Sequence, residues 1–106
     1  MLIRVAEQGT PAFRLRKGEE GLSIFDTESV DPPLTEAEIL DSFRTGSVAV
    51  ARSIEEVKGF GLEVVPIEGA ASLPDRLRRA HVEIRPGRQM SRTQFKQSLK
   101  ELEDGT

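Results

Sequence analysis

Three tetrapeptides in this chain have the pattern of a helix capping box, in which Ser or Thr is followed three residues later by Glu or Gln. They begin at Thr35, Ser53 and Ser91. In such a box the first side chain accepts a hydrogen bond from the fourth amide, and the fourth side chain accepts one from the first amide. Two otherwise unpaired donors at the helix start are thereby satisfied. The sequence predicts three helices that begin at these residues.

The residues after these starts indicate where one helix docks and where another ends. Phe95, Leu99 and Leu102 recur at i, i+4 and i+7, which places them on one stripe of the last helix. The middle helix is short, because Gly59 and Gly61 supply left-handed backbone positions at which it can end. We expect the last helix to pack on the core by its apolar stripe.

Six segments favour β-strands, and they come before, between and after the helices. Several alternate apolar and polar residues, as half-buried strands do, with Val82 and Ile84 on one face of the last segment. Residues 18–21 favour a hairpin loop between the second and third segments, and residues 73–79 favour a turn that is only partly helical. The six segments cover residues 2–6, 12–16, 22–25, 47–52, 62–67 and 81–85.

This order of elements predicts an α+β fold, with a mixed, mostly antiparallel sheet and about three helices packed on it. The chain has 106 residues, which is room for one domain. No repeat, low-complexity stretch or long linker divides it. We therefore expect a single domain over residues 1–106.

Composition limits the chemistry that the chain can perform. It has no Cys and one His, which excludes disulfide scaffolds, cysteine nucleophiles and multi-histidine or thiolate metal sites. No apolar run approaches the ~20 residues that span a bilayer, and the first residues lack the layout of a signal peptide. We expect a cytoplasmic protein with no metal site and no membrane contact.

Charge is divided unevenly along the chain. Residues 19–41 hold eight acids and no base, whereas residues 75–100 hold eight bases and two acids. Such a division can steer an anionic ligand or an acidic partner to one face, or it can make two solvated faces attract each other. Phe95 is the only aromatic residue in the basic segment, so binding of nucleic acid by base stacking ranks below both.

Polar residues at alternate positions of two predicted strands are candidate binding groups. His81, Glu83 and Arg85 share one face of their strand, where they could orient a ribose hydroxyl or stabilise a cationic transition state. The alternative is that they form the ordinary solvent face of the strand. Arg14 and Arg16 also share a face and could bind a phosphate, or they could pair with acids across the hairpin.

A binding cleft would require these two strands to be neighbours. If an anionic cofactor binds, we expect the side chains of Arg14 and His81 to converge in that cleft. Ser23 lies between two apolar residues and is suited to hydrogen bonding a ligand, since the sequence offers no evident partner base that would make it a nucleophile.

Two motifs carry a resemblance to a known family. The segment from Gly21 to Asp26 reads GLSIFD, and far downstream the segment from His81 to Pro86 reads HVEIRP and is followed by Met90. These residues resemble the G-x-S-x-F-D and H-x-x-I-x-P-x-x-x-M patterns of small bacterial toxins with an ADP-ribosyltransferase-like fold. That group includes a type VI secretion effector family and the C-terminal toxin domains of polymorphic toxins.

The resemblance implies a split, mixed sheet that forms an NAD-binding cleft, a toxin that modifies a cellular target, and a cognate immunity protein or antitoxin. Ser23 stands at the Ser of the first motif and His81 at the His of the second. The arginine that such folds place on an early strand is either Arg14 or Arg4. With Arg85, these arginines are the candidate NAD-binding residues.

The sequence departs from the family pattern at the catalytic glutamate. Transferases of this class place a glutamate in an E-x-E or Q-x-E turn, but Glu36 and Glu38, which have that spacing, lie in a capping box. Glu83 is then the candidate, together with His81 and Ser23 as catalytic residues. The chain also has no Tyr or Trp to stack on nicotinamide. The alternative is a non-enzymatic interaction module, such as an antitoxin, an immunity protein or an accessory protein.

Overall fold

The computed structural model describes residues 1–105, and its strands form one antiparallel sheet. Within these residues the sheet has five strands in the order β3-β1-β2-β5-β4, and every neighbouring pair is antiparallel. The α+β expectation is confirmed. The strands are β1 (Leu2–Glu7), β2 (Leu22–Asp26), β3 (Ser47–Arg52), β4 (Glu63–Pro66) and β5 (His81–Arg85).

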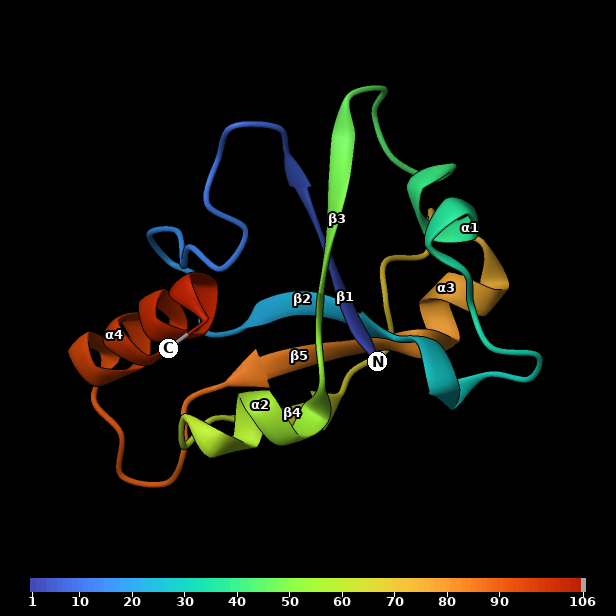
Figure 1. Cartoon of the computed structure of the whole chain (residues 1–106). Helices are drawn as coiled ribbons and strands as arrows, with labels where there is room; N and C mark the ends of the chain where they lie inside the picture. The colour runs from blue at the N-terminus through green and yellow to red at the C-terminus, as the bar shows by residue number, and fades with distance from the viewer. Residues whose placement is uncertain (106) are drawn as a thin grey trace.

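The sheet is split between β1 and β2. These two strands share only the pairs Leu2↔Asp26 and Ile3↔Phe25. By contrast, β1 pairs with β3 along its whole length, and β2 pairs with β5 from Leu22 to Phe25. Figure 1 shows the consequence, because β1 and β3 run across the direction of β2 and β5. The sheet therefore has two parts, β3-β1 and β2-β5-β4, joined at one end.

The predicted helix starts are confirmed at all three positions. Thr35, Ser53 and Ser91 are N-caps, and each side chain accepts a hydrogen bond from the amide three residues on. The middle helix ends at Gly59 as expected, but of the two glycines predicted to be left-handed only Gly61 is, with a φ of 79°, because Gly59 is still helical. The helices are α1 (Glu36–Leu40), α2 (Ile54–Gly59), α3 (Asp75–Ala80) and α4 (Arg92–Asp104), with a 3-10 turn at Thr27–Ser29. Of these, α3 lies in the predicted partly helical turn and has no side-chain cap.

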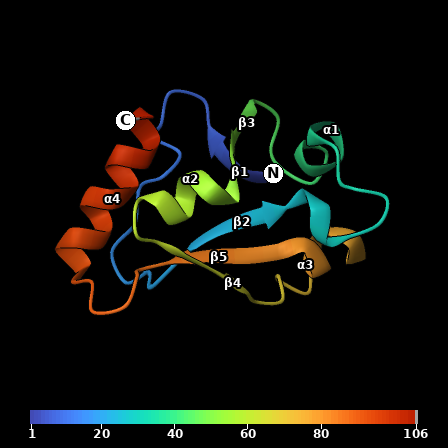
Figure 2. The ribbon, with the colours of Figure 1, turned by 60° about the horizontal axis from the view of Figure 1, so that its bottom comes forward.

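The two faces of the sheet carry separate apolar clusters. On one face α2 and α4 pack against the sheet, and the predicted stripe of α4 is fully buried there. The other face is covered at one end by α1 and α3, which lie together away from α4 (Figures 1 and 2). Residues of the first cluster include Leu2, Leu22, Ile24, Val57, Val82, Ile84, Phe95, Leu99 and Leu102. Those of the second include Ile3, Phe25, Val30, Leu34, Ile39, Leu77 and Ala80.

The predicted strand over residues 12–16 is wrong, and with it the hairpin that it would form. This segment has no regular structure, although Ala12, Phe13 and Leu15 are buried in the core. The backbone N–H of Phe13 donates to the carboxylate of Glu103 on α4 at 2.8 Å rather than to a neighbouring strand. The alternation of apolar residues reflects how the segment packs under α4, which local sequence does not distinguish from a strand.

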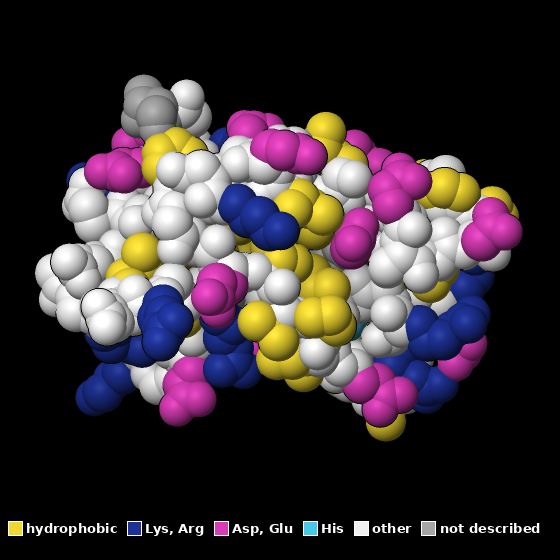
Figure 3. All heavy atoms as spheres, turned by 90° about the horizontal axis from the view of Figure 1, so that it is seen from below, with side chains coloured by type: hydrophobic (Ala, Val, Ile, Leu, Met, Phe, Trp, Pro, Cys, Tyr) yellow, Lys and Arg dark blue, Asp and Glu magenta, His cyan; other side chains and the backbone are white. Residues whose placement is uncertain are grey.

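The free edge of β4 lies on an apolar part of the surface. In Figure 3, hydrophobic side chains gather in the middle of the face that α2 and β4 bring forward, with acidic and basic side chains around them. Val64 and Val65 of β4 are half-buried. Within residues 1–105, no helix has the length and apolar character needed to cross a bilayer.

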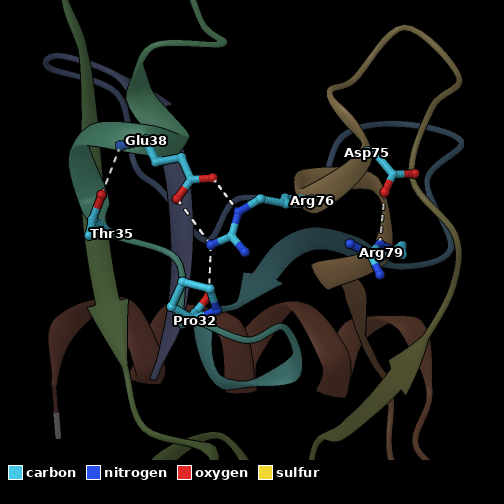
Figure 4. A network of polar contacts seen from close by, with 6 residues as sticks. All are labelled: Pro32, Thr35, Glu38, Asp75, Arg76 and Arg79. Atoms are coloured by element: carbon cyan, nitrogen blue, oxygen red, sulfur yellow. Dashed lines mark hydrogen bonds and ion pairs between the residues drawn. The ribbon is translucent and has the colours of Figure 1, made fainter.

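Arg76 holds α1 and α3 together. Its guanidinium donates from Nε to Oε2 of Glu38 at 2.7 Å and from Nη2 to the carbonyl of Pro32 at 2.7 Å (Figure 4). Glu38 is the fourth residue of the first capping box, so its carboxylate serves Arg76 and not the amide of Thr35. The hydrogen bond from Arg76 lowers the pKa of Glu38 and raises the pKa of Arg76.

We expect Glu38→Gln to make the protein less stable at pH 7 and to lose this effect in acid. The pKa of Glu38 is lower in the folded chain than in the unfolded chain. The ionised carboxylate therefore stabilises the fold above the unfolded-state pKa of about 4.3, and this stabilisation is lost as pH falls through the folded-state pKa. Thermal melts from pH 7 down to strongly acidic pH measure it. Glu36→Gln, at an exposed position in the same turn, is the control. A deficit for Glu38→Gln that persists unchanged in acid would contradict the assignment.

Ser91→Ala should lower the free energy of unfolding by about 1 kcal/mol, because the side chain of Ser91 accepts a hydrogen bond from the amide of Gln94 at the start of α4. Urea denaturation measures the change. Ser72→Ala is a matched control at an exposed position. Equal effects of the two substitutions would show that the cap contributes nothing.

Candidate functional site

Arg4 lies at the split in the sheet and bridges it. From β1 its Nε donates to the carbonyl of Ala12 at 2.9 Å, and its Nη1 donates to the carbonyl of Ser23 on β2 at 2.7 Å. Burial lowers the pKa of Arg4, and the charge of Glu19 opposes that shift. Arginine nevertheless stays protonated in proteins. Of the two candidates for the early-strand arginine, only Arg4 lies on a strand, whereas Arg14 lies in the irregular segment.

A cavity of about 1230 Å³ opens beside Arg4, and we call it the basic cavity. It lies between β1, α4 and residues 12–16, which we call the irregular segment. Its lining includes half-buried or buried apolar groups such as Val5, Phe13 and Leu15. The carboxylates in its lining are Glu7, Glu103 and Asp104. Its basic residues are Arg4, Arg14, Arg16, Lys17, Arg44, Arg92, Lys96 and Lys100.

Most of these positive charges have no carboxylate partner. Within the described residues, Arg44 alone among the eight makes an ion pair, with Glu7 at 3.9 Å. Arg92 donates to the backbone carbonyls of Glu19 at 2.6 Å and Arg16 at 2.9 Å, which leaves its charge unneutralised. The basic cavity is therefore suited to an anion such as a pyrophosphate or a carboxylate.

Ser23 and Glu83 lie directly opposite each other on β2 and β5. Ser23 is exposed, and the carboxylate of Glu83 accepts from Arg85 through Nε at 2.8 Å and Nη2 at 2.7 Å. This ion pair lies over the backbone of Gly21, because a Cβ there would stand 2.6 Å from Oε1 of Glu83. Gly21, the Gly of the GLSIFD motif, thus has no side chain in the space that the Glu83–Arg85 pair occupies.

His81 does not contribute to an open site. It is only 9% exposed, its Nδ1 lies 2.6 Å from the carbonyl oxygen of Ile67, and its ring meets that of Phe25 edge-on. A carbonyl only accepts, so Nδ1 carries the proton. His81, Glu83 and Arg85 share one face of β5 as expected, but residues before α3 cover the His81 end of that face. Only Glu83 and Arg85 are partly accessible.

The expected convergence of Arg14 and His81 is also wrong. The neighbours of Arg14, Phe13 and Leu15, pack with the cluster under α2 and α4, whereas His81 pairs with Phe25 on the opposite face of the sheet. Arg85 lines a second cavity of about 630 Å³ beside β4. The structure thus brings Arg4 to the backbone of Ser23, places Ser23 beside Glu83, and lines the basic cavity with both Arg4 and Arg14. It leaves His81 buried and away from that cavity.

The sequence interpretation overlooked the part that α4 plays in the basic cavity. Arg92, Lys96 and Lys100 recur every four residues along the side of α4 that faces the cavity. That spacing is visible in the sequence, but only the packing of the irregular segment shows what lies opposite it. Comparison of the chain with protein-family models, with curated proteins and with solved structures finds no match.

Proposed function

We propose that this chain is an ADP-ribosyltransferase-like toxin domain that binds NAD at the split between β1 and β2. One observation carries the proposal: Arg4, on the first strand, spans the split and bonds to the carbonyl of the motif residue Ser23. The family resemblance implies a split sheet, an early-strand arginine and this Ser at the NAD cleft. Finding these features at one place supports the proposal.

The residues at the split fit an anionic dinucleotide. Nη2 of Arg4 donates to none of the described residues, so it remains available to a phosphate oxygen. Arg14 and Arg16 line the basic cavity together with Arg4, and neither makes an ion pair with a carboxylate of the described residues. The hydroxyl of Ser23 is exposed and can hydrogen-bond a ribose or an amide.

Glu83 would stabilise positive charge on the ribose as its bond to nicotinamide breaks. NAD supplies the ADP-ribosyl group, and the target supplies the nucleophile that takes it. In the present arrangement Arg85 neutralises Glu83. Activity therefore requires Arg85 to turn from Glu83 toward the substrate.

A non-enzymatic interaction module is the second candidate, and a specific observation favours it. His81 is buried and hydrogen-bonded, and Glu83 is paired with Arg85, so two of the three predicted catalytic side chains are already engaged. Such a module, in the role of an antitoxin, immunity or accessory protein, would bind its partner without turnover.

Expression in bacteria separates the two candidates. We expect the wild-type chain to arrest growth and Glu83→Gln to relieve the arrest, while purified Glu83→Gln still binds NAD in a calorimetric titration. Glu63→Gln, at an exposed position of the neighbouring strand β4, is the control and should arrest growth like wild type. A wild-type chain that neither arrests growth nor binds NAD would overturn the enzyme proposal and favour the module.

A further inference from the structure

We propose that the basic cavity also docks an acidic segment of a partner protein, along a row of cationic side chains on α4. This goes beyond the proposed function, because it concerns a macromolecular partner and does not depend on NAD. The row consists of Arg92, Lys96 and Lys100, and the irregular segment brings Arg14 and Arg16 to the same cavity.

The orientation of α4 fixes this row. Phe95, Leu99 and Leu102 are buried against the sheet, so the row stays on the side that lines the cavity. At 1.5 Å of rise per residue, successive members stand about 6 Å apart along the helix axis. Figures 1 and 2 both show α4 beside the segment that joins β1 to β2. A carboxylate-bearing chain lying along α4 would meet cations from both sides.

Most of the positive charges in the basic cavity are not paired with a carboxylate of the described residues. Elsewhere in the described chain, Arg76, Arg78, Arg79 and Arg85 each pair with a carboxylate. In the basic cavity only Arg44 does so, and weakly, at an exposed position. Gathering like charges without partners costs free energy, and a ligand of opposite charge removes that cost.

An acidic protein segment fits this charge distribution better than a nucleic acid. Eight bases and three acids give the lining of the basic cavity a formal charge of +5. Because the whole chain has a net charge of −3, the residues outside the lining together carry −8. A long polyanion leaving the cavity would meet this negative surface, whereas a short segment would not. The lining also offers apolar contacts, including Val5 and Pro11, and Phe43 is its only exposed aromatic side chain.

The test is fluorescence anisotropy with a labelled peptide rich in Glu and Leu. We expect Lys96→Glu/Lys100→Glu to weaken binding by about tenfold or more, because two attractive charges become repulsive. The control Lys58→Glu/Arg88→Glu makes the same change in net charge at two exposed residues outside both cavities, and should stay within about twofold.

Three outcomes would overturn this proposal. The wild-type chain fails to bind the peptide, the two double variants weaken binding equally, or a labelled oligothymidylate binds wild type more tightly than the peptide does. Circular dichroism confirms that each variant is folded. Because the peptide is titrated without NAD, failure here leaves the NAD proposal standing, and failure of the NAD titration leaves this one standing.

Discussion

Replacing Phe95 with alanine should lower the free energy of unfolding by about 3–5 kcal/mol. Phe95 is 2% exposed and packs with Leu99 and Leu102 in the cluster that joins α4 to the sheet. Truncation removes its buried apolar surface and leaves a cavity that the surrounding residues fill only in part. The loss is a large share of the total stability of about 5–15 kcal/mol usual for such a domain.

Urea denaturation measures this loss, and Phe43→Ala supplies the control. Phe43 undergoes the same chemical change but is 37% exposed, and its ring meets that of Phe25 in a T-shaped arrangement. Its truncation should cost about 1 kcal/mol or less. If both substitutions have the same small effect, α4 is not docked as described.

Gly87→Ala should destabilise the fold by more than about 2 kcal/mol, since overpacking that moves backbone costs this much or more. A Cβ at Gly87 would stand 2.0 Å from the carbonyl oxygen of Gly61. The added methyl must therefore push apart the end of α2 and the connection from β5 to α4.

Gly59→Ala is the matched control for this prediction. A Cβ at Gly59 meets nothing within 4 Å, and the residue is helical. Alanine there should therefore leave the free energy of unfolding unchanged or raise it by about 0.5–1 kcal/mol. In thermal melts, Gly87→Ala should lower the midpoint of unfolding, whereas Gly59→Ala should raise it or leave it unchanged. Equal stability of both variants would contradict the close approach of Gly87 to Gly61.

The helix starts could be predicted because capping is a local interaction. Ser53 and Ser91 form complete boxes, with both reciprocal hydrogen bonds. Thr35 forms half of one, because Glu38 binds Arg76, which follows it by 38 positions in the sequence. A residue this distant leaves no trace in the local pattern, so the sequence predicts where the helix begins but not how its fourth residue is used.

The segment over residues 12–16 could not be assigned for a related reason. Alternating apolar residues satisfy a strand and an irregular segment packed under a helix equally well. Two of its backbone partners, Glu103 and Arg92, come from α4 near the other end of the chain, and another is Arg4 of β1. The missing strand removed the expected contact between Arg14 and β5, and with it half of the expected site.

The candidate site was predictable only where strand register determines it. Alternation placed His81, Glu83 and Arg85 on one face of their strand, and the register of the sheet adds Ser23, which lies directly opposite Glu83. Alternation does not reveal what covers a face, so the burial of His81 could not be foreseen. The bridge from Arg4 to Ser23 depends on the split of the sheet, which is a tertiary feature.

Amide chemical shifts of the ¹⁵N-labelled chain will show whether NAD binds at the split between β1 and β2. On titration with NAD, the largest changes should fall on Arg4, Val5, Ser23 and residues 12–18, with little change along β4. No saturable change, or changes confined to Glu63, Val65 and the second cavity, would show that NAD does not bind at the split.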